Sequence, residues 1–179
     1  GGGAVVTYQY VPFDELDPQR VSEGQYVAGQ NLLEGLVTPD AAGTGVVPAS
    51  ADKWTVSHDG IVYIFHIRSG VKWSDGTPLT AQDFEWTYRR LLSPSSSTRA
   101  GLTGSSSYSA DLGIKNATGY QLGTVTKWSE VGVKALDASH LRIVLDAPNA
   151  TFLLGMAAPS MVALPQRNLK RFPYSWQTA

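Results

Sequence analysis

The sequence predicts an α+β fold in which helices flank a mixed or antiparallel sheet of about four to six strands. Two pairs of short alternating segments, each joined by a turn sequence, indicate β-hairpins. Two further segments carry a capping residue, then apolar residues at helical spacing, and a proline after the last of them. Hairpins that alternate with amphipathic helices favour a sheet with one face buried beneath helices.

The N-terminal part is predicted to begin with a strand and a helix. Residues 4–10 alternate small or β-branched side chains with aromatic ones, a pattern typical of strands. Ser22 can cap a helix that runs to about Leu36, and a turn rich in Gly, Pro and Asp follows at residues 38–45. The residues that share one side of this helix are Tyr26, Gln30, Leu33 and Val37.

A hairpin is predicted in the central part of the chain. Asp59 and Gly60 form a turn sequence after residues 55–57. Residues 61–67 are rich in β-branched and aromatic side chains, and both faces of this strand carry apolar groups. At least one face must therefore be covered by another element.

The helix after this hairpin has signals at both ends. Following a turn at residues 73–78, the Thr80 hydroxyl can cap a helix that starts at Ala81, and Asp83 completes an acidic variant of the capping box. Pro94 ends the helix. One apolar stripe is formed by Phe84, Tyr88, Leu91 and Leu92.

The C-terminal half contains a second predicted hairpin and further helices. Segments 131–136 and 140–145 alternate and are joined by a turn at residues 137–139. A short helix is predicted at residues 114–122, and a last one at residues 165–172, where the proline occupies the first turn.

Two other segments differ in character. Asn149 is predicted to cap a helix that ends at Pro159. The buried side of that helix is expected to be Phe152, Leu153 and Met156. Residues 93–109 are rich in serine and poor in large apolar groups, so we expect the least regular structure there.

Composition excludes several functional classes. The 179 residues are 42% hydrophobic and 16% charged, with a net charge of −1 and no cysteine. A chain of this size can bury the core of one ordinary domain. Its near-neutral charge provides no field that would attract nucleic acid or an anionic membrane. The absence of thiols excludes disulfides, thiolate zinc sites and a cysteine nucleophile.

No catalytic group, metal site or cofactor is predicted. The histidines, which are too far apart in sequence to pair on one helix or hairpin, are His58, His66 and His140. The aspartates in predicted turns, where a short carboxylate accepts hydrogen bonds from local amides, are Asp59, Asp75 and Asp137. The tryptophans expected to pack the core, and not to stack on sugars, are Trp54, Trp73 and Trp86.

Several motifs, in one order along nearly the whole chain, carry a family resemblance. They are Leu33-Glu34-Gly35-Leu36, Ser57-His58-Asp59-Gly60, Phe65-His66-Ile67-Arg68, Trp73-Ser74-Asp75-Gly76-Thr77-Pro78, Thr80-Ala81-Gln82-Asp83-Phe84, Ile114-Lys115-Asn116-Ala117, Val131-Gly132-Val133-Lys134-Ala135-Leu136-Asp137 and Leu145-Asp146-Ala147-Pro148. In register, they resemble the extracytoplasmic solute-binding proteins of ABC importers, specifically the oligopeptide and dipeptide class (family 5).

The resemblance implies a clamshell of the periplasmic-binding-protein type (type II, cluster C). Two lobes of such a protein close on a ligand by hinge movement, so neither an enzymatic activity nor a cofactor is expected. Family members are much longer, and we therefore expect the sequence to be an N-terminal fragment. Residues 1–33 would start the first lobe, residues 34–157 would form a smaller inserted domain, and residues 158–179 would return to the first lobe.

The function implied by the resemblance is capture of oligopeptides outside the membrane and their delivery to an ABC permease. Glu23, beside Gly24 and Gln25, matches an acidic residue that holds the amino end of the ligand. Its local alternative is a first-turn carboxylate that stabilises a helix. Tyr108 either faces the peptide or belongs to an irregular surface segment. Neither nucleic acid nor a metal is expected as a partner.

Several alternatives remain open at this level. Relatives of the family carry nickel complexes, oligosaccharides, haem or peptide signals, and a different class would be a secreted hydrolase or carbohydrate-binding module. Residues 1–3 have two interpretations. In the first, they are a flexible tether that follows a lipid anchor upstream of Gly1, as in a cell-surface or periplasmic lipoprotein. In the second, they are a remnant of cloning. An unpaired strand at residues 4–10 could join two copies in a dimer.

Overall fold

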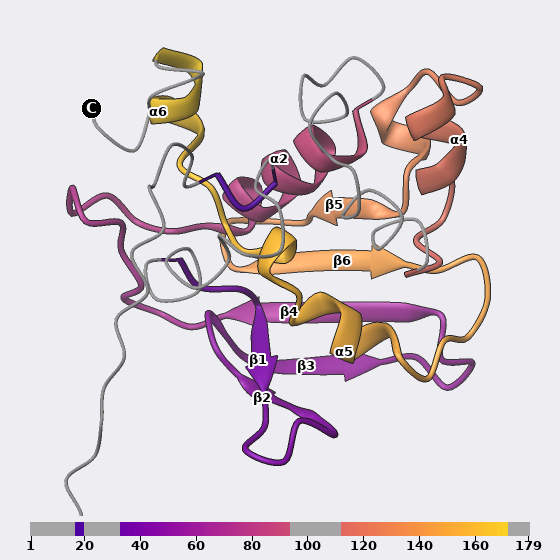
Figure 1. The fold of residues 1–179 in the computed structure, drawn as a ribbon, viewed down its shortest axis with the longest axis horizontal. Coiled ribbons are helices and arrows are strands. Elements are labelled where there is room, and N and C mark those ends of the chain that lie inside the picture. Colours follow the sequence, from indigo (N-terminus) through magenta and orange to yellow (C-terminus); the bar gives the residue numbers. More distant parts are fainter. Residues whose placement is uncertain (1–16, 20–32, 94–111, 172–179) are drawn as a thin grey trace, which may run out of the picture.

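The computed structural model describes residues 17–19, 33–93 and 112–171. Within these ranges lie a 4-stranded antiparallel sheet, ordered β3-β4-β6-β5, and a separate 2-stranded ribbon, β1-β2 (Figure 1). The strands are β1 (Val37–Pro39), β2 (Val46–Pro48), β3 (Ala51–Val56), β4 (Val62–Ile67), β5 (Val133–Ala135) and β6 (His140–Val144). The predicted α+β class with an antiparallel sheet is confirmed.

Helices border this sheet. The described ones are α2 (Ala81–Leu92), α4 (Ala117–Leu122), α5 (Phe152–Met156) and α6 (Gln166–Arg171), with 3-10 turns η2 (Trp128–Glu130) and η3 (Pro159–Met161). Helix α2 packs along β5 and β6, whereas α6 stands away from the sheet (Figure 1). In the described ranges, no helix has the length and apolar character needed to span a bilayer.

The β3-β4 hairpin forms at the predicted turn. The Gly60 amide donates to the Ser57 carbonyl at 2.9 Å, and the Ser57 amide donates to the Val62 carbonyl at 2.9 Å. Gly60 has a φ of 70°, a conformation that costs glycine little and other residues more. The Asp59 carboxylate accepts from the Ile61 amide at 3.1 Å and so fixes the turn locally.

Helix α2 starts and ends as the sequence predicts. The Asp83 carboxylate accepts from the Thr80 amide at 2.8 Å and from the Thr80 hydroxyl at 2.9 Å, which forms the reach-back half of the capping box. The buried apolar stripe contains Phe84, Tyr88, Leu91 and Leu92. Burial raises the pKa of the Tyr88 phenol, whose hydroxyl donates to the Met161 carbonyl at 3.1 Å.

Strand β6 connects the two hairpins into one sheet. It pairs with β5 through the predicted turn, and it also pairs with β4, a strand far away in sequence. Alternation along β4 and β6 places Phe65, Ile67 and Leu141 in the core. Against this face pack Phe84 and Tyr88 from α2 and Phe152 and Met156 from α5.

Two predicted helix boundaries are wrong. Residues 33–36 are not helical, and Val37, assigned above to a helix face, begins β1. It pairs with Pro48 in the β1-β2 hairpin, so the apolar spacing that suggested a helix gave a false signal. Asn149 does not cap α5, which begins at Phe152; its side-chain oxygen instead accepts from the Thr151 amide at 2.9 Å in a preceding turn.

The remaining predictions divide between confirmed elements and undescribed ranges. Helix α4 confirms the short helix expected near residues 114–122, and α6 begins directly after Pro165. The strand at residues 4–10 and the helix start at Ser22 lie outside the described residues, as does nearly all of the irregular segment 93–109.

Candidate functional site

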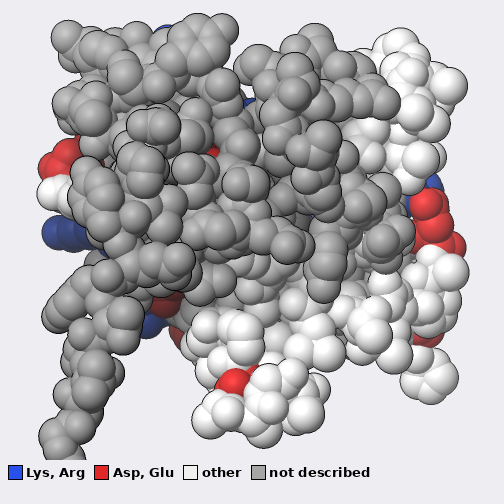
Figure 2. All heavy atoms as spheres, viewed as in Figure 1, with Lys and Arg blue, Asp and Glu red and all other residues white. Residues whose placement is uncertain are grey.

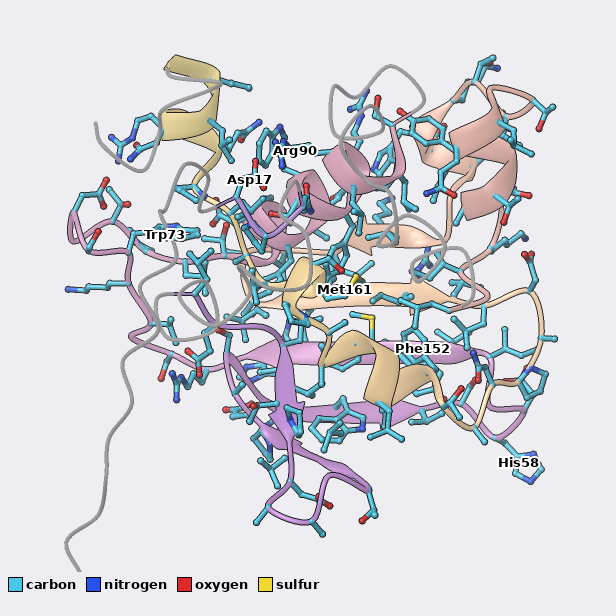
Figure 3. All side chains as sticks on the ribbon, viewed as in Figure 1. Asp17, His58, Trp73, Arg90, Phe152 and Met161 are labelled. Carbon is cyan, nitrogen blue, oxygen red and sulfur yellow. The ribbon has the colours of Figure 1, made fainter. Side chains whose placement is uncertain are left out.

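A buried ion pair holds the short loop at residues 17–19 on helix α2. The Arg90 guanidinium donates to both oxygens of Asp17, with Nη2 2.5 Å from Oδ2 and Nη1 3.2 Å from Oδ1. The side chain of Asp17 is 1% exposed and that of Arg90 is 16% exposed. Such a paired, two-point contact fixes both the position and the orientation of the loop (Figure 3).

Gln19 extends this contact into a network. Its side-chain oxygen accepts from Arg90 Nη1 at 2.6 Å, and its Nε2 donates to the carbonyls of Thr87 at 3.2 Å and Ser160 at 3.4 Å. Its own amide donates to the Asp17 carboxylate at 3.0 Å. The loop is therefore tied to α2 and to η3, although these elements are far apart in the sequence.

A further buried bond joins α2 to the segment that follows η3. The Thr87 hydroxyl accepts from the Leu164 amide at 3.0 Å and donates to the Asp83 carbonyl at 2.8 Å. Thr87 is fully buried, so both bonds replace water that the groups would otherwise bind. We call the set Asp17, Gln19, Thr87 and Arg90 the loop anchor.

The predicted ligand contacts lie beyond this anchor in the chain. Glu23, Gly24, Gln25 and Tyr108 are all outside the described residues. The structure therefore does not test whether these four residues form one site. What it adds is the anchor itself: the chain leaves a rigid attachment at Gln19 four residues before Glu23.

The turn aspartates are structural, as predicted. Asp59, Asp75 and Asp137 each accept a bond from the backbone amide two residues later. Hydrogen bonds from the Ser139 amide, then from His140 and the Ser139 hydroxyl, lower the pKa of Asp137 to about 2. The Ser57 hydroxyl and the Ile61 amide likewise lower the pKa of Asp59. These carboxylates accept hydrogen bonds within their own turns.

The described part of the chain carries charges of both signs at its surface (Figure 2) and tryptophans that pack against its cores. Lys and Arg occur beside Asp and Glu at the margins of the face shown in Figure 2. Trp54 and Trp73 are partly buried against the main core, and Trp86 packs on a second cluster. No described group of three His, Cys, Asp or Glu could hold a metal ion.

One pairing was missed in the sequence. His66 and His140 are direct neighbours across β4 and β6, with ring centroids 5.0 Å apart. The two residues do not share a hairpin, so local spacing carried no signal of their contact. His58 lies apart from them at the tip of the β3-β4 turn (Figure 3).

Comparison with known proteins identifies relatives along most of the chain. The family model described as "Bacterial extracellular solute-binding proteins, family 5 Middle" matches residues 45–178. The Escherichia coli protein named "Probable deoxycholate-binding periplasmic protein YgiS" is 38% identical over 164 residues, which are 90% of this chain and 29% of that protein. The E. coli periplasmic oligopeptide-binding protein OppA is 32% identical over 165 residues, covering 90% of this chain and 28% of OppA.

Solved structures agree with these matches. Haemophilus influenzae OppA in complex with the peptide RPPGFSPFR superposes with a TM-score of 0.80 at 30% identity, over 91% of this chain and 31% of OppA. The E. coli murein tripeptide-binding protein MppA gives a TM-score of 0.78 at 33% identity, over 88% of this chain and 30% of MppA.

The chain thus spans less than a third of the length of these relatives. The likeness also confirms the periplasmic-binding-protein fold, of which the described residues form part of a lobe. By sequence and by structure, the chain belongs to family 5 of the bacterial extracellular solute-binding proteins.

Proposed function

We propose that this chain is part of the receptor of an ABC importer, which captures oligopeptides outside the membrane and delivers them to a permease. The observation that carries the proposal is the likeness of this chain to a peptide-bound OppA, with a TM-score of 0.80 over 91% of the chain. The match to E. coli OppA over 90% of the chain supports it. Capture by such a receptor is a hinge closure of two lobes and breaks no bond.

A division into lobe and inserted domain is part of this proposal. Residues 1–33 and 158–179 would belong to the first lobe, and residues 34–157 to the inserted domain. A small cluster separate from the main core supports it, because Leu33 packs there with Val162, Leu164 and Leu169. Gln19 also bonds to Ser160, so residues before position 34 contact residues after position 158.

The loop anchor supplies a physical reason for ligand binding near Glu23. A receptor for peptides of varied sequence must hold groups that all peptides share, namely backbone amides and carbonyls and the charged ends. Such contacts need a fixed attachment point, because ordering a loose loop on binding lowers the affinity. We propose that Glu23 pairs with the amino end of the peptide, that Gly24 and Gln25 contact its backbone, and that Tyr108 lies beside a side chain.

The experiment is calorimetry on the whole protein with a free tripeptide and with its N-acetylated form. We expect Glu23→Gln to weaken binding of the free peptide about tenfold, the loss of one charged hydrogen bond, and to leave the acetylated peptide unaffected. Glu130→Gln, an exposed site in η2, serves as the matched control. Equal losses for both peptides would contradict the assignment of Glu23, and no binding of any peptide would contradict the receptor function.

A second cargo has its own support. The relative named for deoxycholate binding is 38% identical over 90% of this chain. A steroid carboxylate needs an apolar cavity and one cationic partner, and it has no amino end for Glu23 to hold. Deoxycholate that binds the whole protein and excludes peptides would therefore replace the peptide proposal.

Three further expectations remain predictions. They are the choice between periplasm and cell surface, the lipid anchor upstream of Gly1, and a dimer through residues 4–10. Light scattering on the chain at high concentration tests the last of these, since a monomeric mass removes it.

A further inference from the structure

The face of the sheet opposite the core carries two adjacent imidazoles. His66 lies between the buried residues Phe65 and Ile67 on β4, so its side chain points to the other face. His140 is its direct partner on β6. Their side chains are 29% and 40% exposed, so an ion from solvent can reach both.

Each imidazole is held from behind by a carboxylate. The Nδ1 atom of His66 lies 2.7 Å from Asp52 Oδ1, and Nδ1 of His140 lies 2.9 Å from Asp137 Oδ2. The Ser139 hydroxyl is also 3.1 Å from His140 Nδ1. When Nδ1 donates its proton to a carboxylate, Nε2 of the neutral ring carries the free lone pair. This arrangement of carboxylate and imidazole is the usual one around metal-binding histidines.

The spacing of the rings fits one shared ion. A metal–nitrogen bond of about 2.0–2.1 Å places the ion roughly 3.2 Å from each ring centroid. When the two metal–nitrogen bonds meet at a square-planar or tetrahedral angle, the two ring centroids lie roughly 4.5–5.2 Å apart. The observed centroid separation is 5.0 Å, with the ring planes tilted by 59°. Among the described residues, neither Nε2 atom makes a hydrogen bond.

We propose that His66 and His140 bind one divalent transition-metal ion through their Nε2 atoms, with water in the remaining positions. Imidazole nitrogen favours Cu²⁺, Ni²⁺ and Zn²⁺ over Ca²⁺ and Mg²⁺, which prefer oxygen. Lys53, in register with His66, and Arg142, two residues after His140, add positive charge to this face. The Asp52 and Asp137 carboxylates offset that charge. The bound ion would clamp the two central strands of the sheet together.

The test is titration of the chain, without an affinity tag, with Cu²⁺, Ni²⁺ and Zn²⁺ by calorimetry and by Cu²⁺ electron paramagnetic resonance. We expect one ion per chain, with Cu²⁺ bound most tightly. His66→Asn and His140→Asn keep a side-chain donor near the carboxylate and remove Nε2. Each should weaken Cu²⁺ binding at least tenfold and reduce the nitrogen coupling from two imidazoles to one. His58→Asn, an exposed site on the distant turn, should change neither.

Two further variants separate a built site from chance binding to surface histidines. Asp52→Asn and Asp137→Asn should each weaken binding about 10–100-fold, as expected for the carboxylate behind a metal ligand. Circular dichroism without metal confirms that every variant is folded, and Cu²⁺ should raise the thermal midpoints of the original chain and of His58→Asn more than those of the other variants. Binding that survives both histidine substitutions, or that falls equally with His58→Asn, would overturn the proposal.

Discussion

Two of the ion pairs among the described residues, Asp17–Arg90 and Asp75–Arg167, link segments far apart in the sequence, and they differ in burial. Asp17 and Arg90 are nearly enclosed, and Gln19 bonds to both. Asp75 and Arg167 join the turn before α2 to α6, but their side chains are 47% and 68% exposed. Water can replace a lost partner at the second pair and cannot easily do so at the first. Burial, more than the presence of an ion pair, therefore decides which link holds its segment in place.

The largest expected effect comes from removing the buried guanidinium. Arg90→Leu leaves the Asp17 carboxylate in the interior without its main cation and removes a bond from Gln19. We expect a loss of about 3 kcal/mol in the free energy of unfolding, measured by urea denaturation. The double variant with Asp17→Leu should recover part of that loss, because the buried carboxylate is removed together with its cation. A loss below about 1 kcal/mol for Arg90→Leu would show that water reaches Asp17 after all.

A smaller effect is expected for the neutral link of the same anchor. Thr87→Val keeps the shape of the side chain and leaves the buried Leu164 amide without its acceptor. We expect a loss of about 2 kcal/mol in the free energy of unfolding. Thr55→Val, at an exposed position of β3, is the matched control and should change stability by less than about 0.5 kcal/mol. Equal changes in the two variants would mean that the Leu164 amide finds another partner.

The same contrast between local and distant contacts explains what the sequence could predict. Asp59-Gly60 and Thr80 with Asp83 act within a few residues, so the β3-β4 turn and the start of α2 were predicted correctly. Val37 and Asn149 were assigned to helices because apolar spacing and a capping residue type also occur in other structures: Val37 pairs with Pro48 in a hairpin, and Asn149 accepts a bond in a turn that precedes α5. Local sequence patterns therefore predict that a helix or strand is present better than they predict where it begins and ends.

The contacts at the loop anchor and at the histidine pair were not predicted, because they join segments that are far apart in the sequence. The bond from Arg90 to Asp17 joins residues 73 apart in sequence, and no spacing rule connects them. His66 and His140 meet only because β6 pairs with β4 as well as with its hairpin partner β5. The signals that could have suggested these pairs are a basic residue in the last turn of α2 and a histidine at the same face of each strand.

The smallest expected effect is at the exposed pair. Arg167→Ala should lower the free energy of unfolding by less than about 1 kcal/mol, and 1 M salt should remove the difference because it screens surface charges.

The Thr77 hydroxyl and amide are the main causes of the lowered pKa of Asp75, and Arg167 contributes less. The pKa of Asp75, followed by carboxyl-carbon NMR, should therefore stay below its ordinary value in Arg167→Ala. It should return toward that value in Thr77→Ala, which loses the hydroxyl donor. A full return in Arg167→Ala instead would mean that the exposed pair, despite its contact with water, controls this carboxylate.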